Sequence, residues 1–426
     1  MVAALTGGVV STAWQARRAA AERDLYEAEA ERSDAILDYV SSMFEAASNA
    51  AGSAPVAAKD VLADSAAHLE ERFSHQPADY ARVVEFIGGI YSNFEDEQGA
   101  VAMEQRFLAS PTAADYPDVA AHVRVWLAQS LLRQGDLDAA ESTLEPAQAY
   151  WRLDAQRNRR ELAKSLIIHG QLQKAHGDVD GALVTLRSAL PDAVGNDGRD
   201  TEDSSNIKNS IALALMAQGA FDEADKLMAD VRAYRERDGR GDDGLLMAIQ
   251  NQGAIATARG DYPRAIELLQ QSINGRRERF GPSGALAAAE LNLAKAQVRS
   301  GHPDAALPVL DEAQAMAVQF TGDHSPIVLG VMQTRAEAQL ARNDAAAAAP
   351  WVQQSLDAVR ARGGEKHPLY PMAMALQAQL QSMQRHRDEA RVSIDAAMHA
   401  LDALGKGAAL SRPQVERIQK TVLSTD

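Results

Sequence analysis

The stretch Leu131-Leu132-Arg133-Gln134-Gly135-Asp136-Leu137-Asp138-Ala139-Ala140 decides how this chain folds. Gly135 can adopt the left-handed backbone conformation that often ends a helix. Asp136 can then cap a second helix, which begins with the small and apolar residues that follow. The stretch therefore predicts two helices that are joined by a tight turn and pack closely at Ala140.

This pattern recurs along most of the chain. The small residue at the end of the stretch returns at steps of 40 to 42 residues, as Ala100, Ala140, Ala182, Ala224, Ala265, Ala306, Ala348 and Ala390. A second small residue stands seven positions before each turn residue, as Gly88, Ala128, Gly170, Ala212, Gly253, Ala294, Ala336 and Ala378. Such recurrence is typical of a solenoid, in which each unit buries its apolar face on its neighbours. We expect an all-α superhelical solenoid of about eight helix pairs over residues 79–404.

Other repeated positions support the same unit. The turn residues are Gly135, Gly177, Gly219, Gly260, Gly301 and Asn343, with Glu95 and Arg385 in the first and last units. An apolar residue, here called the anchor, stands nine positions after the turn residue in seven of the eight repeats. The anchors are Leu144, Leu186, Met228, Leu269, Leu310, Val352 and Ile394, and the first repeat has Glu104 at this position. Atypical terminal units are usual in solenoids.

The bulk composition excludes several functions. The 426 residues carry a net charge of −16, whereas phosphate binding needs a clustered basic surface, so we expect no nucleic-acid partner. The absence of cysteine excludes disulfides, thiolate catalysis and cysteine-based zinc sites.

The segments outside the repeats are read separately. Residues 1–13 carry no charge and are followed by Trp14, Arg17 and Arg18, but a membrane-spanning helix needs about 20 apolar residues. Two interpretations stay open: the end of a transmembrane helix that anchors the protein to a membrane, or the start of an alanine-rich amphipathic helix.

Residues 14–78 are predicted to form an N-terminal helical cap, whose second helix runs through Leu62, Leu69 and Phe73. Residues 405–426 form a C-terminal tail with one helix over Gln414–Val422.

The spacing of the small residues is that of the tetratricopeptide repeat, and Leu131–Ala140 resembles this repeat closely. The usual period is about 34 residues, whereas here most steps are 41 or 42 residues. A longer repeat with a Gly-x-x-His-Pro linker, as at Gly364–Pro368, resembles the kinesin light chain type. The resemblance implies a module that binds a protein or peptide.

A second resemblance concerns the N-terminus. Trp14–Arg18 and Ile36–Phe44 are similar to the segment after the transmembrane helix of bacterial membrane-anchored serine/threonine protein kinases. In that family a cytoplasmic kinase domain, one membrane helix and a C-terminal tetratricopeptide region follow in order. The resemblance implies that the repeats are the sensor or scaffold region of a membrane-associated kinase, on the periplasmic or the cytoplasmic side. The alternative is a soluble cytoplasmic scaffold or co-chaperone without a kinase link. A homodimer through the first helices is a further expectation.

Motifs that carry chemistry are incomplete. Gly239–Gly244 matches Gly-x-Gly-x-x-Gly, but no predicted strand precedes it. His386–Asp388 matches the start of a kinase catalytic loop, but Ser393 stands where the metal-binding Asn should be. We therefore expect no catalytic residues, no cofactor and no metal.

The remaining candidate site is the concave face that the first helix of each pair should line. Its predicted residues are mostly amides with a few charged side chains: Gln129, Arg133, Gln171, Lys174, Asn209, Gln250, Asn251, Asn292, Lys295, Arg299, Gln333, Glu337 and Gln379. Amides can donate to and accept from a peptide backbone, and the basic residues can hold a carboxylate. The competing interpretation is that these residues are polar only because an outer helix face is exposed.

Overall fold

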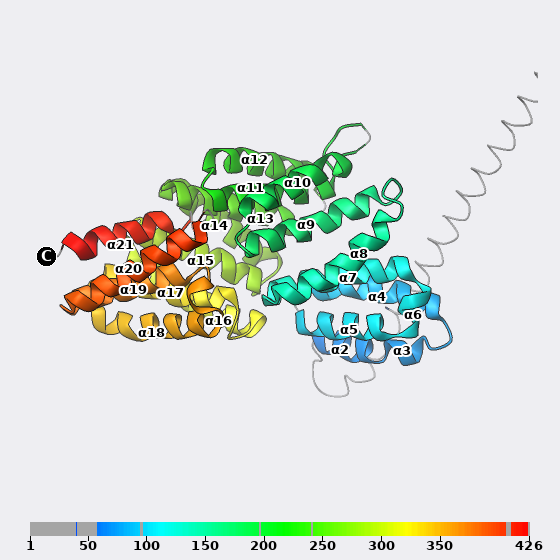
Figure 1. Ribbon diagram of the computed structural model, residues 1–426, viewed down its shortest axis with the longest axis horizontal. Helices are drawn as coiled ribbons and strands as arrows, with labels where there is room; N and C mark the ends of the chain where they lie inside the picture. Colours follow the sequence, from blue (N-terminus) through cyan, green and yellow to red (C-terminus); the bar gives the residue numbers. More distant parts are fainter. Residues whose placement is uncertain are drawn as a thin grey trace, which may run out of the picture. The chain divides into compact units, whose positions relative to one another are not determined.

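The computed structural model describes Val40 and residues 58–93, 97–195, 197–239, 242–405 and 410–424 (Figure 1). The chain divides into two compact units. The first consists of residues 1–133 and 142–150, and the second of residues 134–141 and 151–426. The predictions for residues 1–39 and 41–57, including the apolar segment and the kinase-like motif, lie outside the described residues.

The first unit is helical throughout its described part. Its helices are α2 (Ala58–Ala67), α3 (Leu69–Arg72), α4 (Pro77–Asn93), α5 (Glu97–Ala109), α6 (Pro111–Asp115) and α7 (Pro117–Gln134), with part of α8 (Leu137–Arg152). The ring of Tyr80 on α4 meets that of Phe107 on α5 edge to face, at 5.4 Å between centroids. Arg106 donates a hydrogen bond to the carbonyl of Ala67 at 3.0 Å, which ties α5 to the end of α2.

The prediction of one continuous helix through Leu62, Leu69 and Phe73 is wrong. The helix is interrupted at His68, whose backbone angles of φ −104° and ψ 6° depart from helical values. The His68 ring Nδ1 instead hydrogen-bonds the carbonyl oxygen of Asp64 at 2.9 Å. The segment therefore forms the two helices α2 and α3.

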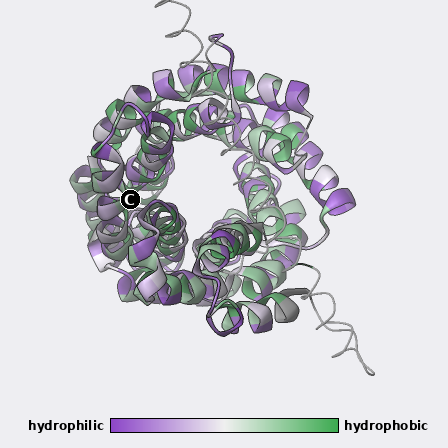
Figure 2. Cartoon of the chain, turned by 90° about the vertical axis from the view of Figure 1, so that its right-hand side faces the viewer, coloured by the Kyte–Doolittle hydropathy of each residue, from purple (hydrophilic) through white to green (hydrophobic). Residues whose placement is uncertain are grey.

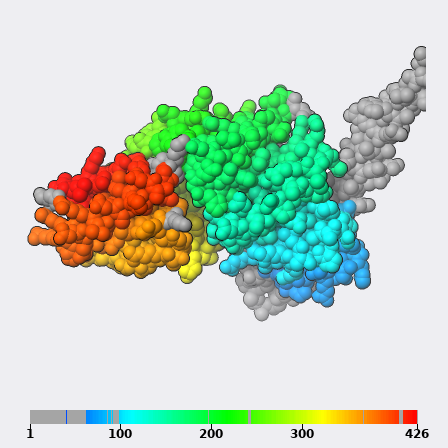
Figure 3. Space-filling view, viewed as in Figure 1, coloured from blue at the N-terminus to red at the C-terminus, as the bar shows by residue number. Residues whose placement is uncertain are grey.

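The second unit continues with paired helices. They are α9 (Arg159–Ala175), α10 (Val179–Ala193), α11 (Glu202–Gln218), α12 (Phe221–Asp238), α13 (Asp242–Arg259), α14 (Tyr262–Arg279), α15 (Gly284–Arg299), α16 (Pro303–Thr321), α17 (Pro326–Ala341), α18 (Ala345–Ala361), α19 (Tyr370–Met383) and α20 (Arg387–Leu404). A short helix, η1 (Gly364–Lys366), precedes α19, and α21 (Arg412–Ser424) follows α20. In Figure 3 the surface of this unit changes from green to orange and red in chain order, as expected when each pair packs on the next.

The odd-numbered helices α9 to α19, here called the A helices, and the even-numbered helices α10 to α20, called the B helices, have different neighbours. Each A helix contacts its own B helix, the preceding B helix where there is one, and the A helices before and after it. Contacts between successive A helices, such as α15 with α17, make them the more enclosed layer. The B helix α20 has a distinct apolar face, whereas the A helices α13 and α17 do not. Figure 2 shows green and purple residues mixed along the helices.

The tight turns between A and B helices form as predicted. Gly177, Gly219, Gly260 and Gly301 have φ between 82° and 88°, and the same left-handed conformation is adopted by Asn343 and Arg385. After the turns, aspartate side chains accept from the backbone N–H three positions on, as Asp178 does from Gly181 at 2.9 Å. These caps satisfy N–H groups that the first turn of a helix leaves without partners.

In two repeats the recurring small residue of the A helix lies against the anchor of its own B helix. A Cβ added to Gly170 would lie 2.7 Å from Leu186 Cγ, and one added to Gly253 would lie 2.6 Å from Leu269 Cγ. The seven apolar anchors are at most 3% exposed. Glu104, which stands at the anchor position of the first repeat, is 2% exposed. The contact of small residue and anchor therefore holds these helix pairs together.

Candidate functional site

The predicted binding residues fall in both units. Gln129 and Arg133 lie on α7 of the first unit, where Gln129 is half-buried and Arg133 is exposed. The others lie on the A helices of the second unit and form one set, which we call the A-face: Gln171, Lys174, Asn209, Gln250, Asn251, Asn292, Lys295, Arg299, Gln333, Glu337 and Gln379.

The A-face is more enclosed than an ordinary outer helix face. No residue of α15, from Gly284 to Arg299, is exposed, whereas its partner α16 exposes Asp304, Glu312 and Val318 among others. The A-face side chains are half-buried, except Gln333, which is only 6% exposed. Their polarity is therefore not explained by free exposure to water, because a half-buried polar group needs a partner.

Several amides of the A-face join successive repeats. Asn251 on α13 donates to Asn209 Oδ1 on α11 at 2.9 Å, and Gln171 on α9 donates to Ser210 Oγ at 3.4 Å. Gln333 donates to the carbonyl oxygen of Leu369 at 3.0 Å, and this bond ties α17 to the start of α19. Because an Asn or Gln amide has two N–H donors and an acceptor oxygen, each pair leaves bonding capacity for a peptide.

Two cations of the A-face lie near a single carboxylate. On α15, Lys295 and Arg299 lie one turn apart, and Arg299 Nε is 3.9 Å from Glu337 Oε1 on α17. The side chains of Arg299 and Glu337 are 20% and 11% exposed. Glu337 also accepts a hydrogen bond from Gln414 of α21. Among the described residues no carboxylate oxygen lies within 4 Å of the Lys295 ammonium, so this cluster carries an excess positive charge.

Burial perturbs the lysines of the A-face. The pKa of Lys295 is lowered to about 8, first by burial and then by the charge of Arg299, while Glu337 acts in the opposite direction. The pKa of Lys174 on α9 is also lowered by burial. A bound carboxylate would stabilise the charged form of either lysine, because an opposite charge favours ionisation.

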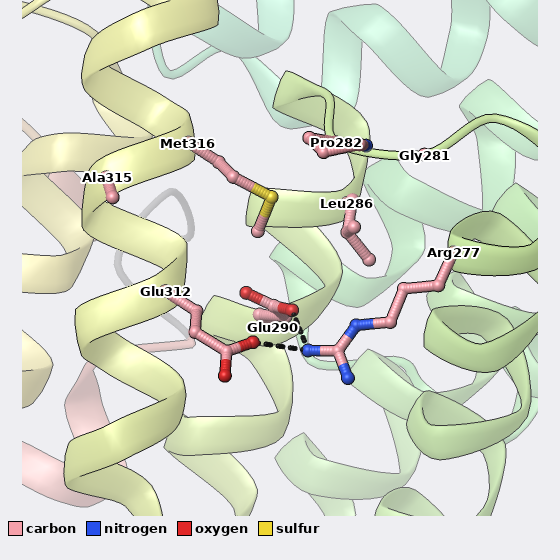
Figure 4. Close-up of a pocket in the computed structure, with 8 residues that line it drawn as sticks. All are labelled: Arg277, Gly281, Pro282, Leu286, Glu290, Glu312, Ala315 and Met316. Atoms are coloured by element: carbon pink, nitrogen blue, oxygen red, sulfur yellow. Dashed lines mark hydrogen bonds and ion pairs between the residues drawn. The ribbon is translucent and has the colours of Figure 1, made fainter.

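A separate pocket of about 420 Å³ lies between α14, α15 and α16. Figure 4 shows the Glu290 carboxylate at its centre, with Arg277 on one side and Glu312 on the other. One Arg277 nitrogen donates to Glu290 Oε1 at 2.6 Å and to Glu312 Oε2 at 2.5 Å. Glu290 is only 1% exposed, and burial raises the pKa of its carboxyl despite the hydrogen bond from Arg277.

Sequence analysis did not identify this pocket. The signal in the sequence is weak, because other repeats carry apolar residues such as Ile249, Met332 and Met374 at the position of Glu290, but two carry the charged residues Arg124 and Lys208. A charged residue at this position therefore does not by itself indicate a buried site. The Glu290 partners Arg277 and Glu312 come from two other helices, so the sequence alone does not bring the three together.

The described part of the chain offers neither a metal site nor a membrane-spanning helix. No three His, Asp or Glu side chains of that part of the chain are grouped so that they could hold a metal ion. None of its helices is both long and apolar enough to cross a membrane.

Comparisons with known proteins agree with this architecture. Models of the tetratricopeptide repeat match residues 121–146, 203–278 and 245–319. No protein of curated function matches the sequence.

Solved structures share the fold at low sequence identity. A Rap protein in complex with competence and sporulation factor is 12% identical, with a TM-score of 0.57, over 93% of this chain and 99% of that chain. The Rap conjugation gene regulator of the plasmid pLS20, in complex with a Phr peptide, is 12% identical, with a TM-score of 0.55, over 85% of this chain and 97% of that one. A putative kinesin light chain of Podosopora anserina is 19% identical, with a TM-score of 0.36, over 49% and 96%. The paired helices, the left-handed turns and the small-residue contacts agree with the family models, so residues 121–146 and 203–319 carry tetratricopeptide repeats within an all-α solenoid of helix pairs.

Proposed function

We propose that the A-face binds a protein or peptide ligand and that the protein acts as a non-catalytic interaction module. The observation that carries the proposal is the cluster of Lys295, Arg299 and Glu337, which places two half-buried cations beside one carboxylate in a protein of net charge −16. A buried charge is costly unless it is paired. A ligand carboxylate would complete the pairing, and the amides around it would hold the ligand backbone.

The structural neighbours make this kind of ligand reasonable. The two Rap structures were solved with a competence and sporulation factor and with a Phr peptide, and both have folds similar to this chain. The likeness extends to the fold alone at 12% identity. The ligand class is therefore argued from the charges and amides of this chain's own A-face.

The test is peptide selection on the whole chain followed by charge removal. Peptides selected from a random library should be enriched in acidic residues or depend on a free C-terminal carboxylate. Replacing Lys295 by Met together with Arg299 by Leu is expected to weaken binding about tenfold to a hundredfold, because it removes a partly desolvated charge partner. Amidated or glutamine-substituted peptides should lose affinity for the wild type only.

The matched control removes two cations elsewhere in the same unit. Lys226 on α12 and Arg360 on α18 are both exposed on B helices, and replacing them by Met and Leu changes the net charge equally. This control should bind as the wild type does. Equal losses in both variants would mean that only the overall charge matters and would refute an A-face site.

The proposed context is a bacterial serine/threonine kinase signalling protein in which the repeats serve as sensor or scaffold. This part of the proposal rests on the N-terminal residues Trp14–Arg18 and Ile36–Phe44 alone. It predicts that the reading frame upstream of Met1 encodes a kinase domain and a membrane helix. An upstream stop codon without such a domain would favour a scaffold or co-chaperone with no kinase link.

A further inference from the structure

The pocket between α14, α15 and α16 is independent of the A-face. Glu290 and Arg299 are nine residues apart on α15, which is two and a half helical turns, so they point to opposite sides of that helix. The pocket is closed at one end by the linker residues Gly281 and Pro282. It opens to solvent beside Arg277 and Glu312, whose side chains are 49% and 60% exposed.

Glu290 is the feature of the pocket that a packing role does not explain. It is 1% exposed, and its Oε2 has no hydrogen-bond partner although it is buried. In Figure 4 the carboxylate faces the space between Arg277, Glu312 and Met316. Leaving a buried carboxylate oxygen without a partner is unfavourable, so a ligand that donates a hydrogen bond to it would be favoured.

The charges in the pocket are unbalanced in a way that defines this ligand. Glu290 and Glu312 carry two negative charges, and Arg277 supplies a single positive charge to both of them. One further cation with N–H groups would neutralise the pocket and satisfy Glu290 Oε2. Arg277 is half-exposed and can keep its bond to Glu312 while a ligand approaches from the solvent side.

The remaining walls are apolar. Leu286, Met316, Pro282 and Ala315 surround the carboxylates, and such walls suit the aliphatic stem of an amphipathic side chain, which buries its methylenes and keeps its head on a charge partner. We propose that this pocket is a second binding site, which takes a guanidinium or ammonium group on an aliphatic stem. The source of the group is an arginine or lysine side chain of a partner protein, or a free alkyl cation.

Calorimetric titration of the whole chain with small probes tests the chemistry. The probes are n-butylguanidinium and n-butylammonium, with n-pentanol as the neutral counterpart of similar shape. The cations are expected to bind at millimolar concentrations or better, and n-pentanol at least about tenfold more weakly. A second arm compares acetyl-Gly-Arg-Gly-amide with n-butylguanidinium, which separates a side-chain ligand from a free cation, and the citrulline version of the peptide is its neutral control.

The variants locate the binding. Glu290→Gln keeps the size of the side chain and is expected to reduce cation affinity at least about tenfold. Glu278→Gln is the matched control, because Glu278 is exposed on α14 and does not line the pocket. It removes the same charge and should leave affinity within about twofold.

A second pair of variants tests the pocket even if Glu290→Gln fails to fold. Ala315 is exposed on α16 at the rim of the pocket, so Ala315→Lys would supply a tethered ammonium and is expected to abolish binding of the free cation. Ala315→Gln, which is neutral, should retain it. The proposal is overturned if neither cation binds, if n-pentanol binds as well as the cations, or if all variants bind equally.

Discussion

Single residues set the spacing of the repeats. The clearest case is the contact between a small residue on an A helix and the anchor on its B helix, as between Gly170 and Leu186. The sequence predicted close helix packing at the recurring small residues, and the structure adds that the anchor leucine is what lies against Gly170. In the first repeat Glu104 is buried at the position where every other repeat has an apolar anchor. Burial at this position therefore depends more on its place in the repeat than on the type of residue.

Gly170→Ala is expected to destabilise the protein by about 1–2 kcal/mol, although alanine is the better helix former. The added Cβ would lie 2.7 Å from Leu186 Cγ, so the two helices would have to separate. Urea unfolding followed by circular dichroism measures the effect. In the background of Leu186→Ala the same substitution should be neutral or stabilising. A full penalty in both backgrounds would show that the contact is not its cause.

The buried charge of Lys295 predicts a dependence of stability on pH. Its pKa is lowered to about 8 in the folded protein, so between pH 8 and the unfolded value near 10.5 the unfolded chain holds a proton that the folded chain lacks. Stability from this group therefore rises with pH in that window, and below pH 8 the ammonium is carried at a cost. Lys295→Met should stabilise the protein by about 1–3 kcal/mol at neutral pH.

The gain from Lys295→Met should shrink as the pH rises from 8 towards 10.5, and urea unfolding at a series of pH values measures it. Lys226→Met, at an exposed position on α12, is the control and should show no such trend. Binding of an acidic peptide to the wild type should weaken above pH 8, as Lys295 loses its charge. If the stabilisation by Lys295→Met grew between pH 8 and pH 10.5, the lowered pKa of Lys295 would be contradicted.

At the scale of elements, α21 completes the second unit. Val415, Ile418 and Val422 are buried against the core formed with α19 and α20, and Gln414 reaches Glu337 on α17. The sequence predicted a helix in this tail. It did not predict the bond to the A-face, because that bond joins residues 77 positions apart.

Ile418→Ala is expected to cost about 2–4 kcal/mol, since it leaves a cavity beneath α21. Hydrogen exchange should accelerate in α19, α20 and α21 and stay unchanged in α9 to α12, because solenoid repeats depend on their near neighbours. Leu423→Ala is the control, as Leu423 is 43% exposed, and it should change stability by less than about 0.5 kcal/mol. Uniform acceleration along the chain would contradict this local role of α21.

At the scale of the whole chain, the repeat period determines most of what could be predicted. It predicted the helix pairs and the turns between them. It could not give the burial of Gln333 or Glu290, because each depends on a linker: Gln333 bonds the carbonyl of Leu369, and Glu290 lies beneath Gly281 and Pro282. The linkers differ in sequence between repeats, so the repeat period does not predict the contacts that they make.

The central claim is that the A-face is where this solenoid binds its ligand, and hydrogen–deuterium exchange with a selected peptide tests it most directly. Bound peptide is expected to slow exchange in α13, α15 and α17, on which Asn251, Lys295 and Glu337 lie. The outer B helices α12 and α18 should be unchanged. Protection confined to B helices, or protection that survives replacement of Lys295 and Arg299, would contradict the account.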